Sequence, residues 1–303
     1  MTNRSENSSG VTAIIVTHNS PPILSRVVQA LLKQTTPPDR IVIVDSGSRD
    51  TSTVTALRSL SEKILVHCCQ NIGFAAANNL AMDMFLVNTE YFLLVNPDAV
   101  LELDWIAGAH AYCQSADGQN AGIVSSPLRG MDVTTQTPTD KWDSLGIYRR
   151  GSGRWYDHGQ RHPIADLRTP TSPYEPKAIC GALMFVPRSV YQTVLDKHGF
   201  FDNRLRTYKE DIDVSLRVAR AGYRLVMLPH LTVHHCRGWP KRRADVPYWA
   251  RKLAARNDVL LAAKHFPLMI PVYIAKLLYV LTIERPLCAL QQRGQLRDRM
   301  YEK

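Results

Sequence analysis

Short apolar runs alternate with helical patterns through the first hundred residues. Apolar runs of about five residues are typical of strands, and apolar residues at helical spacing between them are typical of amphipathic helices. The runs are residues 11–16, 41–44, 64–67 and 91–95. The helical stretches are residues 23–32 and 50–60, and residues 71–87 are expected to form a loop that opens into a helix. Strands that alternate with helices pair in parallel through right-handed crossovers, with helices on both faces. The sequence therefore predicts an α/β fold with a Rossmann-like, mostly parallel sheet flanked by helices.

The loops that follow these four runs are expected to converge. In parallel α/β sheets, ligands sit at the carboxyl ends of the strands. The loops after Val16, Val44, His67 and Val95 are all polar. The chain has no Gly-x-Gly-x-x-Gly and no Gly-x-x-x-x-Gly-Lys-Ser/Thr, which disfavours dinucleotide-binding and P-loop proteins. We expect the four loops to converge on one ligand crevice in an α/β half of the nucleotide-binding type.

Regular patterns become sparse in the middle of the chain. Residues 127–177 are rich in Pro, Gly, Thr, Arg and aromatic residues without periodicity, which predicts an irregular or hairpin insertion. Periodic patterns then predict a strand at 180–186, helices at 188–197 and 211–221, and a strand at 223–228. We assign residues 1–240 to one α/β domain.

Residues 241–303 form a basic and apolar tail of different character. Helical spacing predicts a helix at 248–265, and residues 266–283 are almost wholly apolar apart from Pro267, Pro271 and Lys276. A spanning helix needs about 20 uninterrupted apolar residues. The run is therefore interpreted as a helix that lies in the membrane plane or is partly inserted, and an ordinary buried helix is the alternative.

Charge and cysteine usage restrict partners and location. The formal net charge is +10 and the pI is near 9.4, which suits an anionic partner such as nucleic acid, a membrane surface or a phosphorylated small molecule. Basic residues are spread along the chain without aromatic interleaving, which disfavours nucleic acid. Six scattered cysteines and a polar N-terminus without an apolar stretch predict a reducing compartment, the cytoplasm.

Two acidic segments are candidates for chemistry. Asp98, in Asn-Pro-Asp after a predicted strand, could hold Mg²⁺ or Mn²⁺ against a diphosphate, and an ordinary turn is the alternative. Asp211 begins a predicted helix and could act as a general base, although acids there also stabilise the helix dipole.

Weaker signals come from three other segments. Asp45 follows a strand and suits hydrogen bonds to a ribose or base, and residues 71–79 could bind phosphate at a helix N-terminus. His234 and His235 point to opposite sides of a strand, so at most one is expected to bind metal.

Taken together in chain order, these candidate segments resemble the family 2 glycosyltransferases of the GT-A fold, over roughly residues 11 to 238. The likeness is closest to the rhamnosyltransferase-like branch that builds bacterial surface polysaccharides. Its motifs are Ile-Val-Thr-His-Asn at 15–19, Val-Asp-Ser-Gly-Ser at 44–48, Asn-Ile-Gly-Phe at 71–74, Asn-Pro-Asp-Ala at 96–99, Cys-Gly-Ala at 180–182, Gly-Phe-Phe-Asp at 199–202 and Glu-Asp-Ile-Asp at 210–213. Two departures are Asn96, in place of the first acid of Asp-x-Asp, and residues 205–209, in place of an aromatic stretch.

The resemblance implies a role for each matching residue. Asp211 would be the catalytic base, and Asp98 and His235 would bind Mg²⁺ or Mn²⁺. The residues implied to bind the donor nucleotide are Thr17, Asn19, Asp45, Asn71, Gly73, Asn78 and Asn96. Because basic residues follow His235, we also hypothesise that Arg237 and Lys241 contact the diphosphate from a closing loop, and a solvated basic turn is the alternative.

The resemblance implies an inverting, metal-dependent glycosyltransferase. The donor would be dTDP-rhamnose or otherwise a UDP-hexose. The acceptor would be a saccharide carried on a polyprenyl lipid, in the synthesis of O-antigen or exopolysaccharide. Cations beside the apolar run predict peripheral attachment to the anionic cytoplasmic face of the inner membrane. The alternatives are a sugar-phosphate nucleotidyltransferase, which should show a Gly-rich N-terminal loop with Lys or Arg, and a non-catalytic carbohydrate-binding protein, which should lack Asp98 or Asp211.

Overall fold

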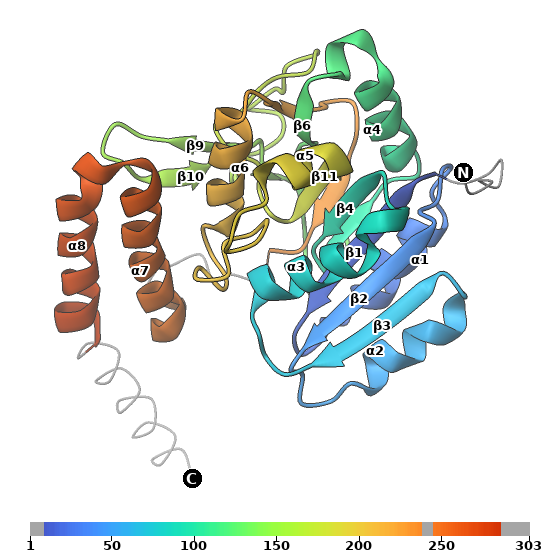
Figure 1. The fold of residues 1–303 in the computed structure, drawn as a ribbon, viewed down its shortest axis with the longest axis horizontal. Coiled ribbons are helices and arrows are strands. Elements are labelled where there is room, and N and C mark those ends of the chain that lie inside the picture. The colour runs from blue at the N-terminus through green and yellow to red at the C-terminus, as the bar shows by residue number, and fades with distance from the viewer. Residues whose placement is uncertain (1–8, 238–244, 286–303) are drawn as a thin grey trace. The chain divides into compact units, whose positions relative to one another are not determined.

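The computed structural model describes residues 9–237 and 245–285 (Figure 1). The chain divides into two compact units. Residues 1–206 with 210–237 form the first, which we call the sheet unit, and residues 207–209 with 238–303 form the second, the tail unit. Three residues from the middle of the chain thus belong with the C-terminal region, which the sequence did not predict.

A seven-stranded sheet forms the centre of the sheet unit (Figure 1), in the order β12-β6-β11-β4-β1-β2-β3. Its strands are β1 (Val11–Thr17), β2 (Arg40–Ser46), β3 (Ile64–Cys69), β4 (Tyr91–Val95), β6 (Ala121–Ser125), β11 (Leu183–Pro187) and β12 (Arg224–Met227). β1 pairs in parallel with β2 and β4, β2 with β3, and β6 with β12. β11 runs antiparallel to β4 and β6. The prediction of a mostly parallel sheet is confirmed.

Helices cover both faces of this sheet. They are α1 (Leu24–Leu32), α2 (Ser52–Ala56), α3 (Phe74–Phe85), α4 (Trp105–Gln114), α5 (Arg188–Val194) and α6 (Glu210–Arg220). Neighbouring β1 residues point to opposite faces. Ile15 belongs to a buried cluster with α1 and with Trp105 of α4, and Ile14 to a second cluster with α3, α6 and Tyr191 of α5. Each face therefore has its own apolar core.

A smaller sheet of order β5-β13-β7-β8 belongs to the same unit. Its strands are β5 (Ala99–Leu101), β13 (Val233–His235), β7 (Leu128–Met131) and β8 (Pro138–Ser144), and β9 (Ile147–Arg149) and β10 (Trp155–Asp157) form an antiparallel hairpin. Residues 127–177, predicted to be an irregular or hairpin insertion, contain this hairpin together with β7 and β8, whose pairing shifts register at two points. Strands this short, with mixed burial, carry no clear period-2 signal.

Helix ends differ from the predictions in small ways. α5 ends at Val194, because Leu195 takes an extended conformation. α2 is followed by a 3₁₀ turn at Leu57–Leu60. Gly222, with φ +90°, follows α6 as predicted, since glycine adopts this left-handed conformation without a Cβ clash.

Two helices dominate the tail unit. α7 (Tyr248–His265) leads through a 3₁₀ turn at Pro267–Met269 into α8 (Ile270–Tyr279), which continues as a π-helical turn at Val280–Glu284. Arg251 of α7 pairs with Glu284 at 3.1 Å, and Asp258 of α7 pairs with Lys276 of α8. Within the described residues, the segment 267–284 is long and apolar enough to cross a membrane, judged by length and composition alone.

Candidate active site

The loops after β1, β2 and β3 interlock at the carboxyl edge of the large sheet. The N–H of Asn19 donates to Ser48 Oγ at 2.6 Å, and Asn19 Oδ1 accepts the N–H of Arg49 at 3.2 Å. Gly47 has φ +79°, and a Cβ there would lie 2.6 Å from the Asn71 nitrogen. Three of the four loops expected to converge therefore touch one another, and the approach of the second to the third requires glycine.

Two residues assigned to the donor nucleotide are buried at the ends of the strands that lead into these loops. Asp45 is 0% exposed, and its carboxylate accepts the N–H of Ser48 at 2.8 Å and the Ser48 hydroxyl at 2.6 Å. Thr17 is also buried. Both side chains shape the loops from within, and the contact of Asp45 with the nucleoside stays a prediction.

Protein groups already occupy part of the N-terminus of α3, where the sequence predicts a phosphate. The N–H of Ala75 donates to the Arg206 carbonyl at 2.8 Å. Gly73, with φ +85°, lies against Arg206, whose carbonyl oxygen would be 3.2 Å from a Cβ at this position. Asn78 is buried and donates its amide to the carbonyl of Phe74 at 3.0 Å. The Ala75 N–H is therefore not free for a phosphate, and Asn78 stabilises its own helix.

The turn between β4 and β5 presents Asp98. Asn96, at the start of the turn, donates its N–H to the carbonyl of Ala182 at 2.9 Å, and the carbonyl of Asp98 accepts the N–H of Cys236 at 3.0 Å. β13 pairs with β5 so that His235 lies opposite Ala99. This pairing puts His235 Nε2 3.2 Å from Asp98 Oδ1, and the Asp98 side chain remains 22% exposed.

The side chains of the two adjacent histidines of β13 point to opposite sides of the strand, as expected for neighbouring strand residues. His235 is buried, whereas His234 Nε2 lies on the other side of the strand, 3.1 Å from Glu102 Oε1. Only His235 of this pair contacts Asp98.

Asp143 of β8 holds the opposite side of the His235 ring. The distance from His235 Nδ1 to Asp143 Oδ2 is 2.7 Å, so Nδ1 donates to Asp143 and Nε2 faces Asp98. Burial alone would lower the pKa of His235, but Asp98 and Asp143 raise it to about 10. The ring without a metal is therefore protonated at neutral pH, and a cation held through Nε2 would displace that proton.

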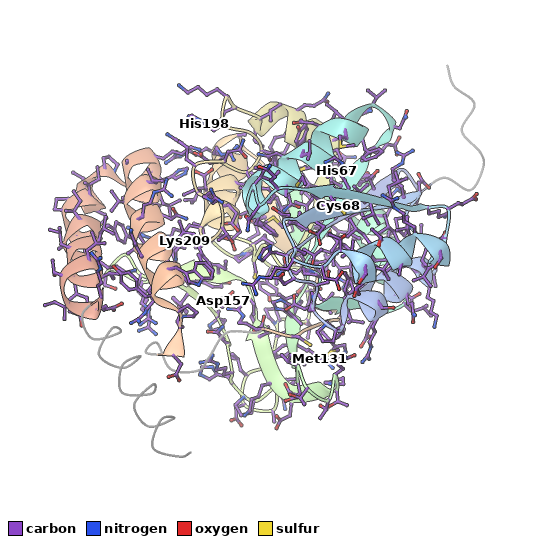
Figure 2. The ribbon with its side chains drawn as sticks, turned by 90° about the horizontal axis from the view of Figure 1, so that it is seen from below. His67, Cys68, Met131, Asp157, His198 and Lys209 are labelled. Atoms are coloured by element: carbon purple, nitrogen blue, oxygen red, sulfur yellow. The ribbon has the colours of Figure 1, made fainter. Side chains whose placement is uncertain are left out.

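Arg237 completes this cluster of buried charges. Its Nε lies 2.7 Å from Asp143 Oδ1, and its Nη1 lies 2.8 Å from Oδ2 of Asp157, the hairpin residue labelled in Figure 2. Burial alone would raise the pKa of Asp143, but His235 and Arg237 hold it below its usual value. Protein carboxylates thus engage Arg237, and its contact with a diphosphate stays a prediction. Lys241, assigned to the same role, lies outside the described residues.

The donor set fits a divalent cation that binds together with a diphosphate. Asp98 and His235 supply a carboxylate oxygen and an imidazole nitrogen that already face each other. Among residues 9–237 and 245–285, no group of three or more His, Cys, Asp or Glu side chains could hold a metal unaided. Mg²⁺ sites commonly use one or two carboxylates and complete their shell with substrate phosphates and water. Asp98 and His235 would therefore hold Mg²⁺ or Mn²⁺ only as part of a donor complex.

Asp211, the predicted base, lies in the first turn of α6. Its Oδ1 accepts the N–H of Ile212 at 2.8 Å, and its Oδ2 accepts the N–H of Gly181 at 3.1 Å. A Cβ on Gly181 would lie 3.2 Å from the Asp211 Cβ, so glycine permits this close approach. The nearby Asp213 is instead buried in an ion pair with Arg217 at 2.9 Å, which marks it as structural.

A short chain of contacts connects Asp211 with the charge cluster. Arg237 Nη2 lies 3.9 Å from Cys180 Sγ, and Cys180 directly precedes Gly181. Burial, followed by the charge of Asp157, raises the pKa of Cys180 well above its usual value, so this thiol stays neutral and is not a nucleophile. A series of contacts, through Asp143, Arg237 and the Cys180–Gly181 segment, thus links Asp98 and His235 with Asp211.

Asp143 and Asp157 are the site residues that sequence reasoning missed. Both lie in residues 127–177, where no periodic pattern marks strands. Asp143 is a buried acid beside the buried Trp142. A carboxylate inside an apolar strand is costly unless it is paired, and that signal could have singled it out.

Two solved structures share this fold. GalNAc-T7 with UDP, GalNAc and Mn²⁺ superposes with a TM-score of 0.65 at 17% identity, over 86% of this chain and 48% of that chain. The mannosyltransferase PcManGT from Pyrobaculum calidifontis, with GDP-Man and Mn²⁺, gives a TM-score of 0.53 at 19% identity, over 92% and 72%. The chain spans about half the length of GalNAc-T7. The fold is that of the GT-A glycosyltransferases, as predicted.

The family follows from the sequence match. The model of glycosyl transferase family 2 matches residues 12–193, more than half of the chain. The chain belongs to glycosyl transferase family 2 and is a glycosyltransferase.

Curated relatives of the chain are rhamnosyltransferases. The N-acetylglucosaminyl-diphospho-decaprenol L-rhamnosyltransferase of Mycobacterium tuberculosis is 23% identical over 236 residues, 73% of this chain and 74% of the relative. The O-antigen chain rhamnosyltransferase RfbN of Salmonella typhimurium is 22% identical over 247 residues, 79% and 70% of the two chains. The predicted likeness to the rhamnosyltransferase branch is confirmed.

Proposed function

We propose that this chain is a metal-dependent, inverting hexosyltransferase that moves a sugar from a nucleoside-diphosphate sugar to a hydroxyl of a lipid-linked saccharide in bacterial polysaccharide synthesis. The observation that carries the proposal is the Asp98–His235 pair, oriented by Asp143 and linked to Asp211 by this series of contacts. The relatives named above favour a rhamnosyl donor, dTDP-rhamnose, with UDP-hexoses second.

The donor half of the site uses the sheet edge and the metal pair. The interlocked loops carrying Asn19, Asn71 and Gly73 would receive the nucleoside, with Asn96 at the adjoining turn. Asp98 and His235 would hold the cation, which neutralises the charge of the departing diphosphate. Asp143 fixes the orientation of His235, so that Nε2 is presented without further rearrangement.

The acceptor half uses Asp211. Two backbone N–H groups, from Gly181 and Ile212, hold its carboxylate in one orientation. Asp211 takes the proton of the acceptor hydroxyl as that oxygen attacks the anomeric carbon. Attack from the face opposite the diphosphate inverts the configuration, and the proton ends on Asp211.

The tail unit suits attachment to the cytoplasmic face of the inner membrane, where a polyprenyl-linked acceptor would be found. Large apolar side chains of its last helical segment are exposed, namely Leu268, Val272, Ile274, Leu278, Tyr279 and Ile283. α8 is tied to α7 at two points, by Lys276 with Asp258 and by Glu284 with Arg251. Because these ion pairs hold the apolar segment against a polar helix, they favour a helix lying in the membrane plane over one crossing it.

Thermal unfolding with nucleotides tests the donor site. The purified protein is heated with dTDP, UDP or GDP, each with Mn²⁺ and with EDTA, because a ligand bound only by the folded state raises stability by mass action. The cognate nucleotide raises Tm only with Mn²⁺, and Asp98→Ala abolishes the shift. Asp140→Ala, which removes an exposed carboxylate of β8, keeps it. No shift with any nucleotide contradicts the proposed donor site.

A further inference from the structure

The four residues before α6 have an unusual backbone. Arg206, Tyr208 and Lys209 have φ of +61°, +70° and +75°. None is glycine, asparagine or aspartate, the residues that adopt this left-handed region most easily. Such a conformation persists only where surrounding contacts impose it, and it is typical of functional sites. Residues 206–209 immediately precede Glu210 and Asp211.

Asn257 of α7 is the side chain that holds this segment within the tail unit. Its amide nitrogen donates to two consecutive carbonyls, that of Thr207 at 2.9 Å and that of Tyr208 at 2.8 Å. Asn257 is 0% exposed. A buried amide is costly unless hydrogen-bonded, and here both amide hydrogens are directed at the strained segment.

A charge pair and a ring contact reinforce the same segment. Lys209, labelled in Figure 2, has its Nζ 3.6 Å from Oδ1 of Asp258, the buried neighbour of Asn257. The rings of Tyr208 and Trp249 lie 6.4 Å apart. All three residues of 207–209 are therefore contacted by α7.

The flanking residues belong to the sheet unit and are fixed there. The carbonyl of Arg206 accepts the N–H of Ala75 at the start of α3. On the other side, Glu210 begins α6, and Asp211 is held by Gly181. The conformation of residues 207–209 can reach Asp211 through the chain itself, because only Glu210 separates Lys209 from it.

We propose that Asn257, supported by Asp258, is a positioning residue for Asp211, so that the tail unit serves catalysis as well as membrane attachment. The inference rests on the proposed function, in which Asp211 is the base. Removing the Asn257 amide removes its hydrogen bonds to two adjacent carbonyls and lets Tyr208 and Lys209 relax from their left-handed φ values. The first turn of α6 then loses its fixed start, and the Asp211 carboxylate moves away from the acceptor hydroxyl.

The test compares Asn257→Ala with Glu284→Gln. The control variant weakens the buried pair with Arg251 in the same unit but leaves residues 207–209 untouched. Turnover of donor by Asn257→Ala is expected to fall roughly 100-fold in kcat, since a displacement of about 1 Å has that cost, with KM for the donor unchanged. Glu284→Gln stays close to wild type, and Asn257→Gln, which keeps the amide donors, recovers part of the loss.

A double variant separates positioning from a structural role. Added to Asp211→Asn, Asn257→Ala should cause no further loss of turnover, because two residues that act through one group are not additive. A multiplicative loss, or a KM that rises with the fall in kcat, overturns the inference.

Hydrogen exchange gives a readout that does not depend on activity. Exchange of the amides of residues 207–212 is expected to accelerate roughly 5- to 100-fold in Asn257→Ala, from the loss of two hydrogen bonds, and to stay unchanged in Glu284→Gln. If exchange in Asn257→Ala equals that of the wild type, the positioning role is overturned, whether or not the wild type transfers sugar. Absence of turnover in the wild type contradicts the proposed function instead.

Discussion

Replacing Asp143 with asparagine removes one buried negative charge without changing the shape of the side chain. Its Oδ2 accepts the proton of His235 Nδ1 at 2.7 Å, and its Oδ1 lies 2.7 Å from Arg237 Nε. An asparagine oxygen can still accept from Nδ1, but the ring loses the charge that makes Nε2 a better ligand. Changes to such an orienting carboxylate typically cost 10- to 100-fold in metal affinity, or about 1.4 to 2.7 kcal/mol. We expect a loss near the lower limit for Asp143→Asn and near the upper limit for Asp143→Ala.

The assay is a Mn²⁺ titration at saturating nucleoside diphosphate, with free Mn²⁺ followed by electron paramagnetic resonance. The matched control is Asp157→Asn, because Asp157 also pairs with Arg237, at 2.8 Å, but contacts Ser144 rather than His235. Both variants lose part of the Arg237 pairing, and only the Asp143 variants should lose Mn²⁺ affinity. Equal losses in the two, or none in either, would refute the orienting role of Asp143.

Three further predictions concern the proposed base Asp211, the proposed metal ligand His235 and the apolar face of α8. Gly181→Ala brings a Cβ to 3.2 Å from the Asp211 Cβ, so we expect kcat to fall while the nucleotide-induced Tm shift persists. An unchanged kcat would show that the close contact between Gly181 and Asp211 is not required. The pKa of His235 is raised from 6.5 to about 10, so in EDTA its contribution to stability is full below pH 6.5 and is lost as pH rises through 10; urea unfolding should show this slope in the wild type but not in His235→Gln. Leu278→Asp should release the protein from anionic vesicles in a flotation assay, whereas Val87→Asp, at an 84% exposed position of the sheet unit, should not; equal flotation of the two would contradict attachment through α8.

The sheet was predictable because burial on both faces forces continuous apolar runs. Val11–Thr17 and Arg40–Ser46 are buried along almost their whole length, and the helices between such strands fix their parallel direction. The direction of β11 was not predictable. Its apolar run reads the same for a parallel or an antiparallel strand, and the chain reaches it from β10 rather than from a crossover helix.

The candidate site was predictable in part. Asp98 and Asp211 follow recognisable boundaries, the end of a strand and the start of a helix, and their residue types carry the signal. The pairing of His235 with Asp143 depends on β13 and β8 lying in one small sheet, which no local pattern encodes. The link from Asn257 to Thr207 and Tyr208 is likewise tertiary, between a helical amide and a loop about fifty residues earlier.

Transfer of labelled sugar by the wild type and by Asp211→Asn tests the central claim most directly. Radiolabelled dTDP-rhamnose is incubated with Mn²⁺, enzyme and bacterial membrane lipids, and label is counted in the lipid fraction, with UDP-hexoses in parallel. The account predicts Mn²⁺-dependent transfer by the wild type and a loss of roughly 100- to 10,000-fold in Asp211→Asn, which still shows the nucleotide-induced Tm shift. An Asp211→Asn variant that binds nucleotide and transfers sugar at the wild-type rate would contradict it.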